Sequence, residues 1–262
     1  VNYYDTAYIY PGSEALIGEI FEKNGIRDRV KIATKLPHYL IKSREGMEKL
    51  FREHLKRLKT DYIDIYFLHR DNEKIPVAEI MPVLNDFVKS GKVHFIGASN
   101  WTTKRIEEAN KFAIENNMEP FCVSQINYSL AHSSVDTFGD PTLVCMNMRE
   151  YKWYEKHNFP VMAFSPQAKG FFAKLAKGDT AKNLPEAQFT GTANLARLAR
   201  VKALSDETGY SPAVIPLGYL SSQPFFVSSV FAATKLWQLE EDMQAGDTIL
   251  DERQIAFLEN RM

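Results

Sequence analysis

The chain has 262 residues, of which 45% are hydrophobic and 25% are charged. This length suits one globular domain, and an α/β barrel of about 250 residues is a common fold at this size. The net charge of -1 argues against a nucleic-acid-binding surface or an acidic tail.

The predicted strands and helices alternate along the chain. The strands are expected at 1–7, 30–36, 62–69, 93–98, 121–128, 160–165 and 227–233. The helices are expected at 14–23 after a Ser13 cap, with Leu16, Ile20 and Phe21 on one face, and at 43–59 with Ser43 as its cap. Further helices are expected at 76–90, 102–116, 142–157, 192–208, 212–222, 236–245 and 252–260. A long loop separates the sixth strand from the helix at 192–208. Apolar residues spaced to form one face predict the helices, and short apolar runs predict the strands.

Alternating strands and helices predict a parallel sheet with right-handed crossovers. We expect a (β/α)8 TIM barrel that forms one domain over residues 1–262. Only seven strands are predicted, and the pattern starts within a strand, so the first β/α unit is expected to be missing from the given chain. A doubly wound open sheet is the alternative, but it would usually place a GxGxxG turn after an early strand, and the sequence has none.

Two cysteines, Cys122 and Cys145, form neither a disulfide framework nor a metal-ligand spacing, so we predict no metal site. The sequence has no apolar run of ~18 residues and no signal-peptide pattern at its start. A cytoplasmic protein with no membrane or nucleic-acid partner is therefore expected. The sequence does not predict the oligomeric state.

Four polar residues are predicted to meet at the carboxyl ends of neighbouring strands. Asp5, Lys35 and His69 end the first three strands, and Tyr10 lies in the loop after Asp5. Working residues of a barrel lie at this rim. A lysine ammonium beside a tyrosine hydroxyl favours loss of the phenolic proton, and a histidine can hydrogen-bond a carbonyl oxygen. Each residue alone is more simply a cap, a surface group or a core residue, but the four together favour proton transfer to a carbonyl.

Seven strings of the sequence resemble motifs of the aldo-keto reductase family and occur in that family's order. They are DTAYIYPGSE (5–14), IATKL (32–36), DIYFLHR (64–70), IGASN (96–100), SQINYS (124–129), AFSPQAKG (163–170) and AATKLWQLEED (232–242). The resemblance extends from Val1 to about Ala245. It implies that Asp5, Tyr10, Lys35 and His69 are the family's catalytic tetrad.

The same resemblance implies a nicotinamide cofactor. Ser99, Asn100 and Gln125 would hydrogen-bond the nicotinamide amide, and Phe164 would stack on its ring. The pyrophosphate would be held by Ser165, Gln167 and Lys169, and the adenosine end by Thr234, Gln238, Glu241 and Asp242. Lys169 replaces the usual Arg, and Asp242 replaces the usual Asn and adds a negative charge. NADPH is expected, with NADH as the alternative.

The resemblance predicts an oxidoreductase that transfers hydride from NAD(P)H to an aldehyde or ketone, with Tyr10 as proton donor. The partner is then a small carbonyl substrate. Candidates for an apolar substrate wall are His38, Tyr39, Trp101, Phe138 and Phe172, each of which is equally well explained by surface or core packing. The alternative function is a cofactor-binding regulatory module that resembles the β subunits of potassium channels.

Overall fold

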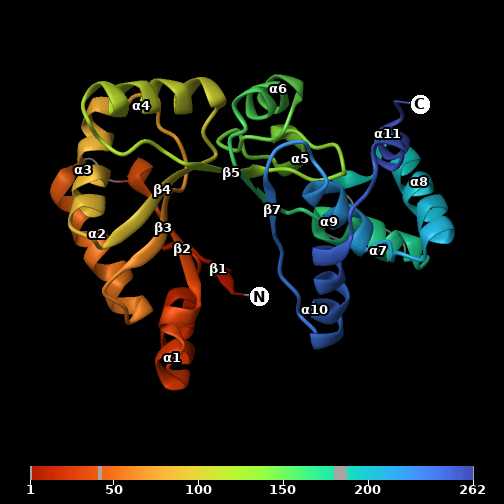
Figure 1. Cartoon of the computed structure of the whole chain (residues 1–262), viewed down its shortest axis with the longest axis horizontal. Helices are drawn as coiled ribbons and strands as arrows, with labels where there is room; N and C mark the ends of the chain where they lie inside the picture. The colour runs from red at the N-terminus through yellow and green to blue at the C-terminus, as the bar shows by residue number, and fades with distance from the viewer. Residues whose placement is uncertain (1, 41–42, 180–187, 262) are drawn as a thin grey trace. The chain divides into compact units, whose positions relative to one another are not determined.

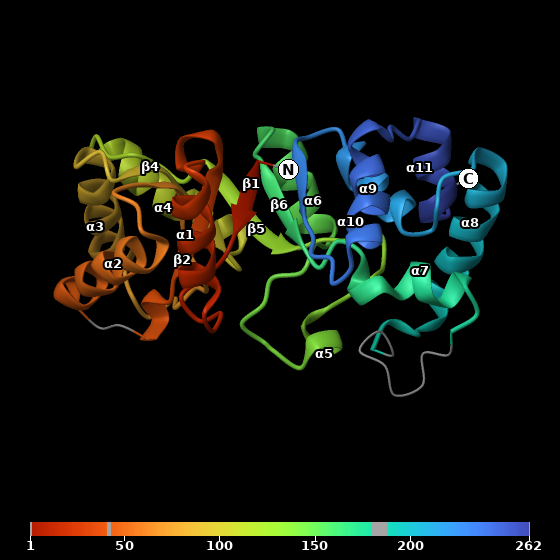
Figure 2. The ribbon, with the colours of Figure 1, turned by 90° about the horizontal axis from the view of Figure 1, so that it is seen from below.

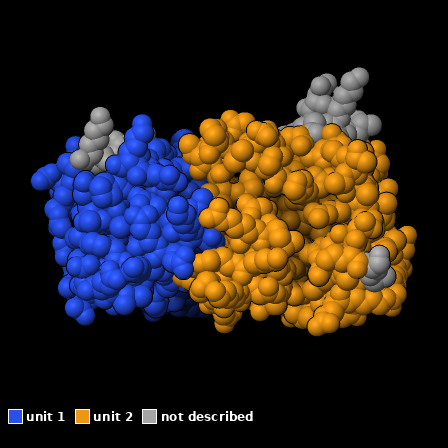
Figure 3. All heavy atoms as spheres, turned by 90° about the horizontal axis from the view of Figure 1, so that it is seen from above, with its two compact units in different colours: residues 1–124 blue, residues 125–262 orange. Residues whose placement is uncertain are grey.

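The computed structural model of the chain describes residues 2–40, 43–179 and 188–261. Two units, residues 1–124 and residues 125–262, are each compact by themselves (Figure 3). That the chain forms one domain stays a prediction. Strands and helices alternate in both units, as the sequence predicts.

The first unit contains four parallel strands in chain order: β1 (Tyr3–Asp5), β2 (Lys31–Leu36), β3 (Ile63–Leu68) and β4 (Val93–Ser99). Their registers fix which side chains are neighbours at the carboxyl ends. Asp5 pairs with Ala33, and Lys35 pairs with Phe67. The residues that end these strands therefore lie on one edge of the sheet, where parallel α/β folds bind ligands.

Four helices accompany these strands: α1 (Ser13–Asn24), α2 (Arg44–Leu58), α3 (Val77–Lys89) and α4 (Thr103–Glu115). Figure 1 shows α2, α3 and α4 beside one another, and each packs on the next. Ser43 caps α2, as predicted, by accepting a hydrogen bond from the Gly46 N–H.

The predicted start of α1 is wrong by one residue. Gly12 occupies the capping position with a left-handed φ of 74°, and Ser13 is the first helical residue. The Ser13 hydroxyl accepts a hydrogen bond from the Thr6 hydroxyl instead. Phe21 is buried, whereas Leu16 and Ile20, predicted on the same face, are exposed. α1 packs on α2, and Figure 2 shows the two helices beside one another.

The second unit is built from strands β5 (Val123–Asn127), which begins just before the boundary, β6 (Val161–Phe164) and β7 (Val227–Val230). The last two pair in parallel. Its helices are α5 (Val135–Phe138), α6 (Met148–His157), α7 (Phe171–Ala176), α8 (Thr192–Thr208), α9 (Val214–Ser221), α10 (Leu236–Met243) and α11 (Glu252–Glu259). Every residue of α9 except the last is buried, so this helix forms part of the unit's core.

The helix predicted at 142–157 is shorter than expected. It begins at Met148 because the Asn147 side chain caps it, accepting hydrogen bonds from the N–H groups of Arg149 and Glu150. The preceding residues extend beside β5, where Asn127 and Cys145 form an isolated parallel bridge. The predicted loop after β6 also contains the short helix α7.

Among the residues that the structure describes, no helix combines the length and apolar character needed to cross a lipid bilayer.

Candidate active site

Asp5 and Lys35, which the sequence places at neighbouring strand ends, form an ion pair in the first unit. Lys35 Nζ lies 2.5 Å from Asp5 Oδ2 and 2.8 Å from the carbonyl oxygen of Thr6, to which it donates. The two side chains are only 1% and 9% exposed. A buried charge needs such partners, because burial of an unpaired ammonium is costly. The arrangement holds the Lys35 ammonium at one place on the sheet edge.

Tyr10 and His69 lie beside this ammonium. Lys35 Nζ is 5.1 Å from the centroid of the Tyr10 ring, and the Tyr10 and His69 rings meet edge to face at 5.8 Å. A turn holds Tyr10, whose N–H donates to the carbonyl of Ala7. Tyr10 is 40% exposed, unlike the buried Lys35 and His69. The four predicted residues thus converge, and the tyrosine is the member that a molecule in solution can reach.

His69 is a neutral imidazole at pH 7. Burial lowers its pKa to about 3, and the charges of Lys35 and Arg70 act in the same direction. A neutral ring keeps one N–H donor and one acceptor nitrogen. The Nδ1 atom is buried and has no hydrogen-bond partner. Such a ring can donate a hydrogen bond to a carbonyl oxygen without carrying a charge itself.

Ser99 and Asn100 stand at the carboxyl end of β4, next to the tetrad. Asn100 has a left-handed φ of 56°, a conformation uncommon outside glycine but tolerated by asparagine. Its Nδ2 donates to the His69 carbonyl at 3.3 Å and to Ser99 Oγ at 3.1 Å. Left-handed non-glycine residues are frequent at functional sites. Both residues fit the predicted role of holding an amide beside His69.

Gln125 and Phe164 lie on β5 and β6. Gln125 is buried within β5, and Phe164 is the half-buried last residue of β6. The Asn127 side chain donates to the Phe164 carbonyl at 3.2 Å and thereby ties the two strand ends together. The Phe164 ring keeps an exposed part, which an aromatic ligand ring needs for stacking.

The segment after β6 has an unusual backbone. Ser165, Ala168 and Lys169 all have left-handed φ angles, of 51°, 49° and 58°, and Gly170 follows at 85°. Gln167, with a φ of -97°, directly precedes the left-handed Ala168, and such a change of hand can turn successive backbone N–H groups toward a concavity that binds anions. Lys169 Nζ adds a positive charge there and donates to Gln188 Oε1 at 3.2 Å. This segment fits a bound phosphate group.

Two residues predicted to bind different parts of the cofactor contact one another. Gln167 Nε2 donates to Asp242 Oδ1 at 2.6 Å and to the Ala213 carbonyl at 3.2 Å. Asp242 is only 5% exposed. Burial raises the pKa of its carboxyl group, and the hydrogen bond from Gln167 opposes that shift. The negative charge of Asp242 is therefore engaged inside the unit.

Thr234 and Gln238 are joined at the start of α10. Gln238 Oε1 accepts hydrogen bonds of 3.0 Å from the Thr234 N–H, the Thr234 hydroxyl and the Lys235 N–H. Glu241 is half-buried one turn further along. These contacts cap the helix, which is the ordinary structural role of such residues. Binding of adenosine by them stays a prediction.

The predicted substrate wall is only partly supported. Phe172 lies in the core of the second unit, and Phe138 packs against it, so core packing explains both. His38 and Trp101 are buried in the first unit, with ring centroids 6.0 Å apart, close to the carboxyl ends of β2 and β4. Tyr39 is half-buried next to them.

The charged residue Arg105, which contacts Trp101, was not predicted, because one arginine on an amphipathic helix gives no signal in the sequence.

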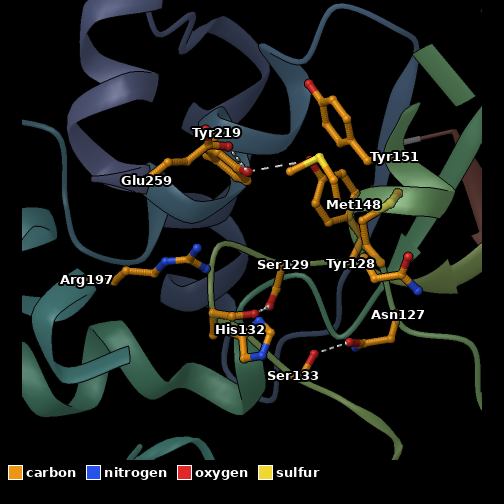
Figure 4. Close-up of a pocket in the computed structure, with 13 residues that line it drawn as sticks. Asn127, Tyr128, Ser129, His132, Ser133, Met148, Tyr151, Arg197, Tyr219 and Glu259 are labelled. Carbon is orange, nitrogen blue, oxygen red and sulfur yellow. Dashed lines mark hydrogen bonds between the residues drawn. The ribbon is translucent and has the colours of Figure 1, made fainter. Parts of the chain in front are cut away.

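A separate cavity of about 320 Å³ lies within the second unit (Figure 4). Tyr219 forms part of its wall, and its hydroxyl donates to Glu259 Oε1 at 2.6 Å and lies 3.5 Å from the Tyr128 hydroxyl. Asn127 Oδ1 accepts a 2.5 Å hydrogen bond from Ser133. None of the residues proposed from the sequence lines this cavity, and its walls come from segments too far apart in the chain for a pattern to link them.

Comparison with known proteins decides the family. The model of the Aldo/keto reductase family matches residues 1–260. The chain belongs to this family. The resemblance inferred from the seven strings is therefore confirmed.

Individual proteins are also similar to this chain. The crystal structure of an aldo-keto reductase from Klebsiella pneumoniae in complex with NADPH is similar over 100% of this chain and 80% of that one, with 23% identity and a TM-score of 0.76. A probable voltage-gated potassium channel subunit beta from Arabidopsis thaliana is 26% identical over 95% of this chain and 79% of its own length. A norsolorinic acid reductase from Emericella nidulans is 26% identical over 99% of this chain and 68% of its own. The structural likeness confirms the predicted (β/α)8 fold, of which seven strands lie in the part of the chain described here.

Proposed function

We propose that this aldo-keto reductase reduces an aldehyde or ketone with hydride from NADPH and that Tyr10 is the proton donor. The observation that carries the proposal is the convergence of Tyr10, Lys35 and His69 on one edge of the sheet, with Lys35 Nζ held by Asp5 at 2.5 Å. Family membership and the NADPH bound to the Klebsiella pneumoniae relative support it.

The chemistry follows from these side chains. The nicotinamide, when bound, supplies the hydride. Neutral His69 donates a hydrogen bond to the substrate oxygen and orients it, and Tyr10 gives its proton to that oxygen. The phenolate left on Tyr10 is stabilised by the Lys35 ammonium, because an opposite charge nearby favours the ionised form. Asp5 holds the Lys35 side chain in place. The residues supply positioning and polarisation, while the redox chemistry belongs to the cofactor.

The contacts of Asp242 bear on the choice of cofactor. From the sequence, this carboxylate would repel the 2′-phosphate of NADPH. Its burial and its hydrogen bond to Gln167 weaken that repulsion, and the exposed side chain of Lys235 supplies a positive charge for a phosphate. We therefore propose a preference for NADPH by about tenfold, which corresponds to ~1.4 kcal/mol.

The similarity to a potassium channel subunit beta supports a second candidate function, in which the protein binds a cofactor and acts on a partner. The two functions differ in one property. A reductase turns over an aldehyde at the expense of NADPH, whereas a purely regulatory module binds NADPH without steady consumption. The exposure of Tyr10 and the complete tetrad favour turnover.

Replacement of Tyr10 by Phe tests the proposed reaction. Tyr10→Phe removes the proton donor and keeps the ring, so reduction of 4-nitrobenzaldehyde should fall about 10²–10⁴-fold, the usual weight of a general acid. NADPH binding, followed by its fluorescence, should stay within about twofold, since Tyr10 is not among the residues that hold the cofactor.

Tyr8→Phe is the matched control. The Tyr8 hydroxyl donates to Glu53 Oε2 at 3.1 Å, outside the tetrad, so this variant should keep the parental rate. If Tyr10→Phe also reduces the aldehyde at the parental rate, Tyr10 is not the donor. NADPH binding without turnover by the parent protein would favour the regulatory function.

A further inference from the structure

The segment that follows β3 connects two parts of the proposed site. It leaves the sheet at His69 and runs from Arg70 to Ile75, while α4 begins just after Asn100 on the next strand. The side chain of Arg105, on α4, reaches back to this segment. Arg105 is 8% exposed, which is unusual for an arginine and requires that its charge and N–H groups be satisfied inside the protein.

The guanidinium group of Arg105 makes polar contacts in two directions. One terminal nitrogen, NH2, donates to the Ile75 carbonyl at 2.5 Å, and the other, NH1, donates to Glu108 Oε1 at 3.0 Å. Its Nε lies 3.4 Å from Asp71 Oδ2, an ion-pair distance. Both ends of the segment after His69 are therefore held by one planar group on α4.

Arg105 also holds an aromatic ring in place. Its guanidinium carbon lies 5.3 Å from the centroid of the Trp101 ring, within the range of a cation–π contact. The Trp101 indole N–H donates to the Arg70 carbonyl at 3.2 Å, which links the ring to the same segment. Trp101 is fully buried and packs on His38. The ring, the segment and the arginine form one connected cluster.

We propose that Arg105 is a positioning residue that fixes the segment 70–75 and the Trp101 ring beside His69 and so determines how a carbonyl substrate is seated. The expected effect on turnover rests on the proposed reduction. The positioning of the segment and of the Trp101 ring rests on the contacts of Arg105 alone. Arg105 does not touch the tetrad itself. It acts through Asp71 and Ile75 of the segment and through Trp101, which directly follows Asn100 and whose indole N–H donates to the Arg70 carbonyl.

The role requires the planar, forked group of arginine. A lysine ammonium would keep the charge near Trp101 and Asp71 but could not donate in fixed directions to Ile75 and Glu108 at the same time. The comparison of Arg105→Lys with Arg105→Gln therefore separates geometry from charge. Lys104→Gln on the same helix is a matched control, because Lys104 is exposed.

The experiment measures turnover and local order on the same variants. For 4-nitrobenzaldehyde with saturating NADPH, both Arg105 variants should raise KM about tenfold, the scale of one lost charge-assisted hydrogen bond. kcat and the Kd for NADPH should change less than about threefold, since the groups that transfer the proton remain. By NMR, hydrogen exchange of the Trp101 indole N–H should accelerate at least about tenfold by the same argument. The indoles of Trp153 and Trp237, both in the second unit, are internal references.

Two results overturn the proposal. One is a KM within twofold of the parent in either Arg105 variant while the parent is active. The other is unchanged exchange of the Trp101 indole in folded Arg105→Gln protein, with folding checked by the melting temperature. If the parent reduces no aldehyde, the proposed reduction fails, and the exchange measurement alone then decides whether Arg105 holds the segment.

Discussion

Burial sets the protonation of two histidines near the candidate active site. The pKa of His69 is lowered to about 3, mainly by burial. His38 is only 1% exposed, neither of its ring nitrogens has a partner, and burial, with the charge of Arg105, lowers its pKa to about 4. Both rings are neutral at pH 7. A neutral His69 suits a group that must donate a hydrogen bond rather than repel the Lys35 ammonium.

These shifts predict how stability depends on pH. An unfolded histidine has a pKa near 6.5. Between pH 6.5 and about pH 4 the unfolded chain binds a proton that folded His38 refuses, so stability is lost as the pH falls, by up to about 1.4 kcal/mol per pH unit. Asp71 acts in the opposite direction, because burial raises its pKa to about 6 and the folded chain takes up its proton first.

The substitution His38→Gln removes one of these titrating groups. The free energy of unfolding in urea should fall less between pH 7 and pH 5 in the variant than in the parent, by about 1–2 kcal/mol. His132→Gln, at an exposed histidine, should leave the parental dependence unchanged. Equal dependence in parent and His38→Gln would show that His38 titrates normally in the folded protein.

The residue types of the site were predictable, but their states were not. Asp5, Lys35 and His69 stand at strand ends in the sequence, and this placement alone predicts that they meet. The neutrality of His69 depends on burial, which no local pattern reveals. Likewise, Asp242 looks like a repulsive charge in the sequence, whereas the structure pairs it with Gln167, 75 residues away.

At the scale of elements, the contact between α1 and α2 depends on one glycine. A Cβ atom at Gly18 would lie 2.6 Å from the Arg57 carbonyl oxygen and 2.7 Å from the Leu58 carbonyl carbon. Both are backbone atoms at the end of α2, so the helix as a whole would have to move. Since α1 follows directly on the turn that carries Tyr10, this close packing also supports the candidate site.

The substitution Gly18→Ala should therefore lower the stability of the protein, although replacing a helical glycine by alanine usually raises it. In an exposed helix this change stabilises by about 1 kcal/mol, but overpacking against backbone costs about 1–3 kcal/mol. We expect a net loss of about 1 kcal/mol or more in urea denaturation. Gly246→Ala is the control, because a Cβ there meets no atom within 4 Å. A more stable Gly18→Ala protein would refute the close contact.

The sequence predicted the existence of these elements better than their ends. The caps decide the ends, and capping depends on local geometry. Ser43 caps α2 as predicted, whereas Ser13 lies inside α1 because Gly12 supplies the left-handed turn. Asn147 starts α6 six residues later than the apolar pattern suggested. Gly18 shows the same limit, since helical periodicity carries no information about the backbone of a neighbouring helix.

At the scale of the whole molecule, the order of the seven strings predicted the family, and the match over residues 1–260 confirms it. The same order predicted the barrel. Strings of this kind succeed because each marks one strand end, and strand ends are the points that a barrel brings together. That the chain folds as one domain and prefers NADPH remain predictions, and a single unfolding experiment tests both.

We expect one cooperative thermal transition, raised by NADPH more than by NADH. The Trp153→Phe/Trp237→Phe variant keeps only Trp101, so its fluorescence reports the first unit, while far-UV circular dichroism reports the whole chain. One domain requires that the two curves coincide.

A ligand that binds only the folded chain stabilises it by RT ln(1 + [L]/Kd). At equal concentrations well above both Kd values, a tenfold preference adds ~1.4 kcal/mol for NADPH, or about 3–6 °C in melting temperature. Separate transitions would contradict the single domain, and an equal or larger shift with NADH would contradict the cofactor preference.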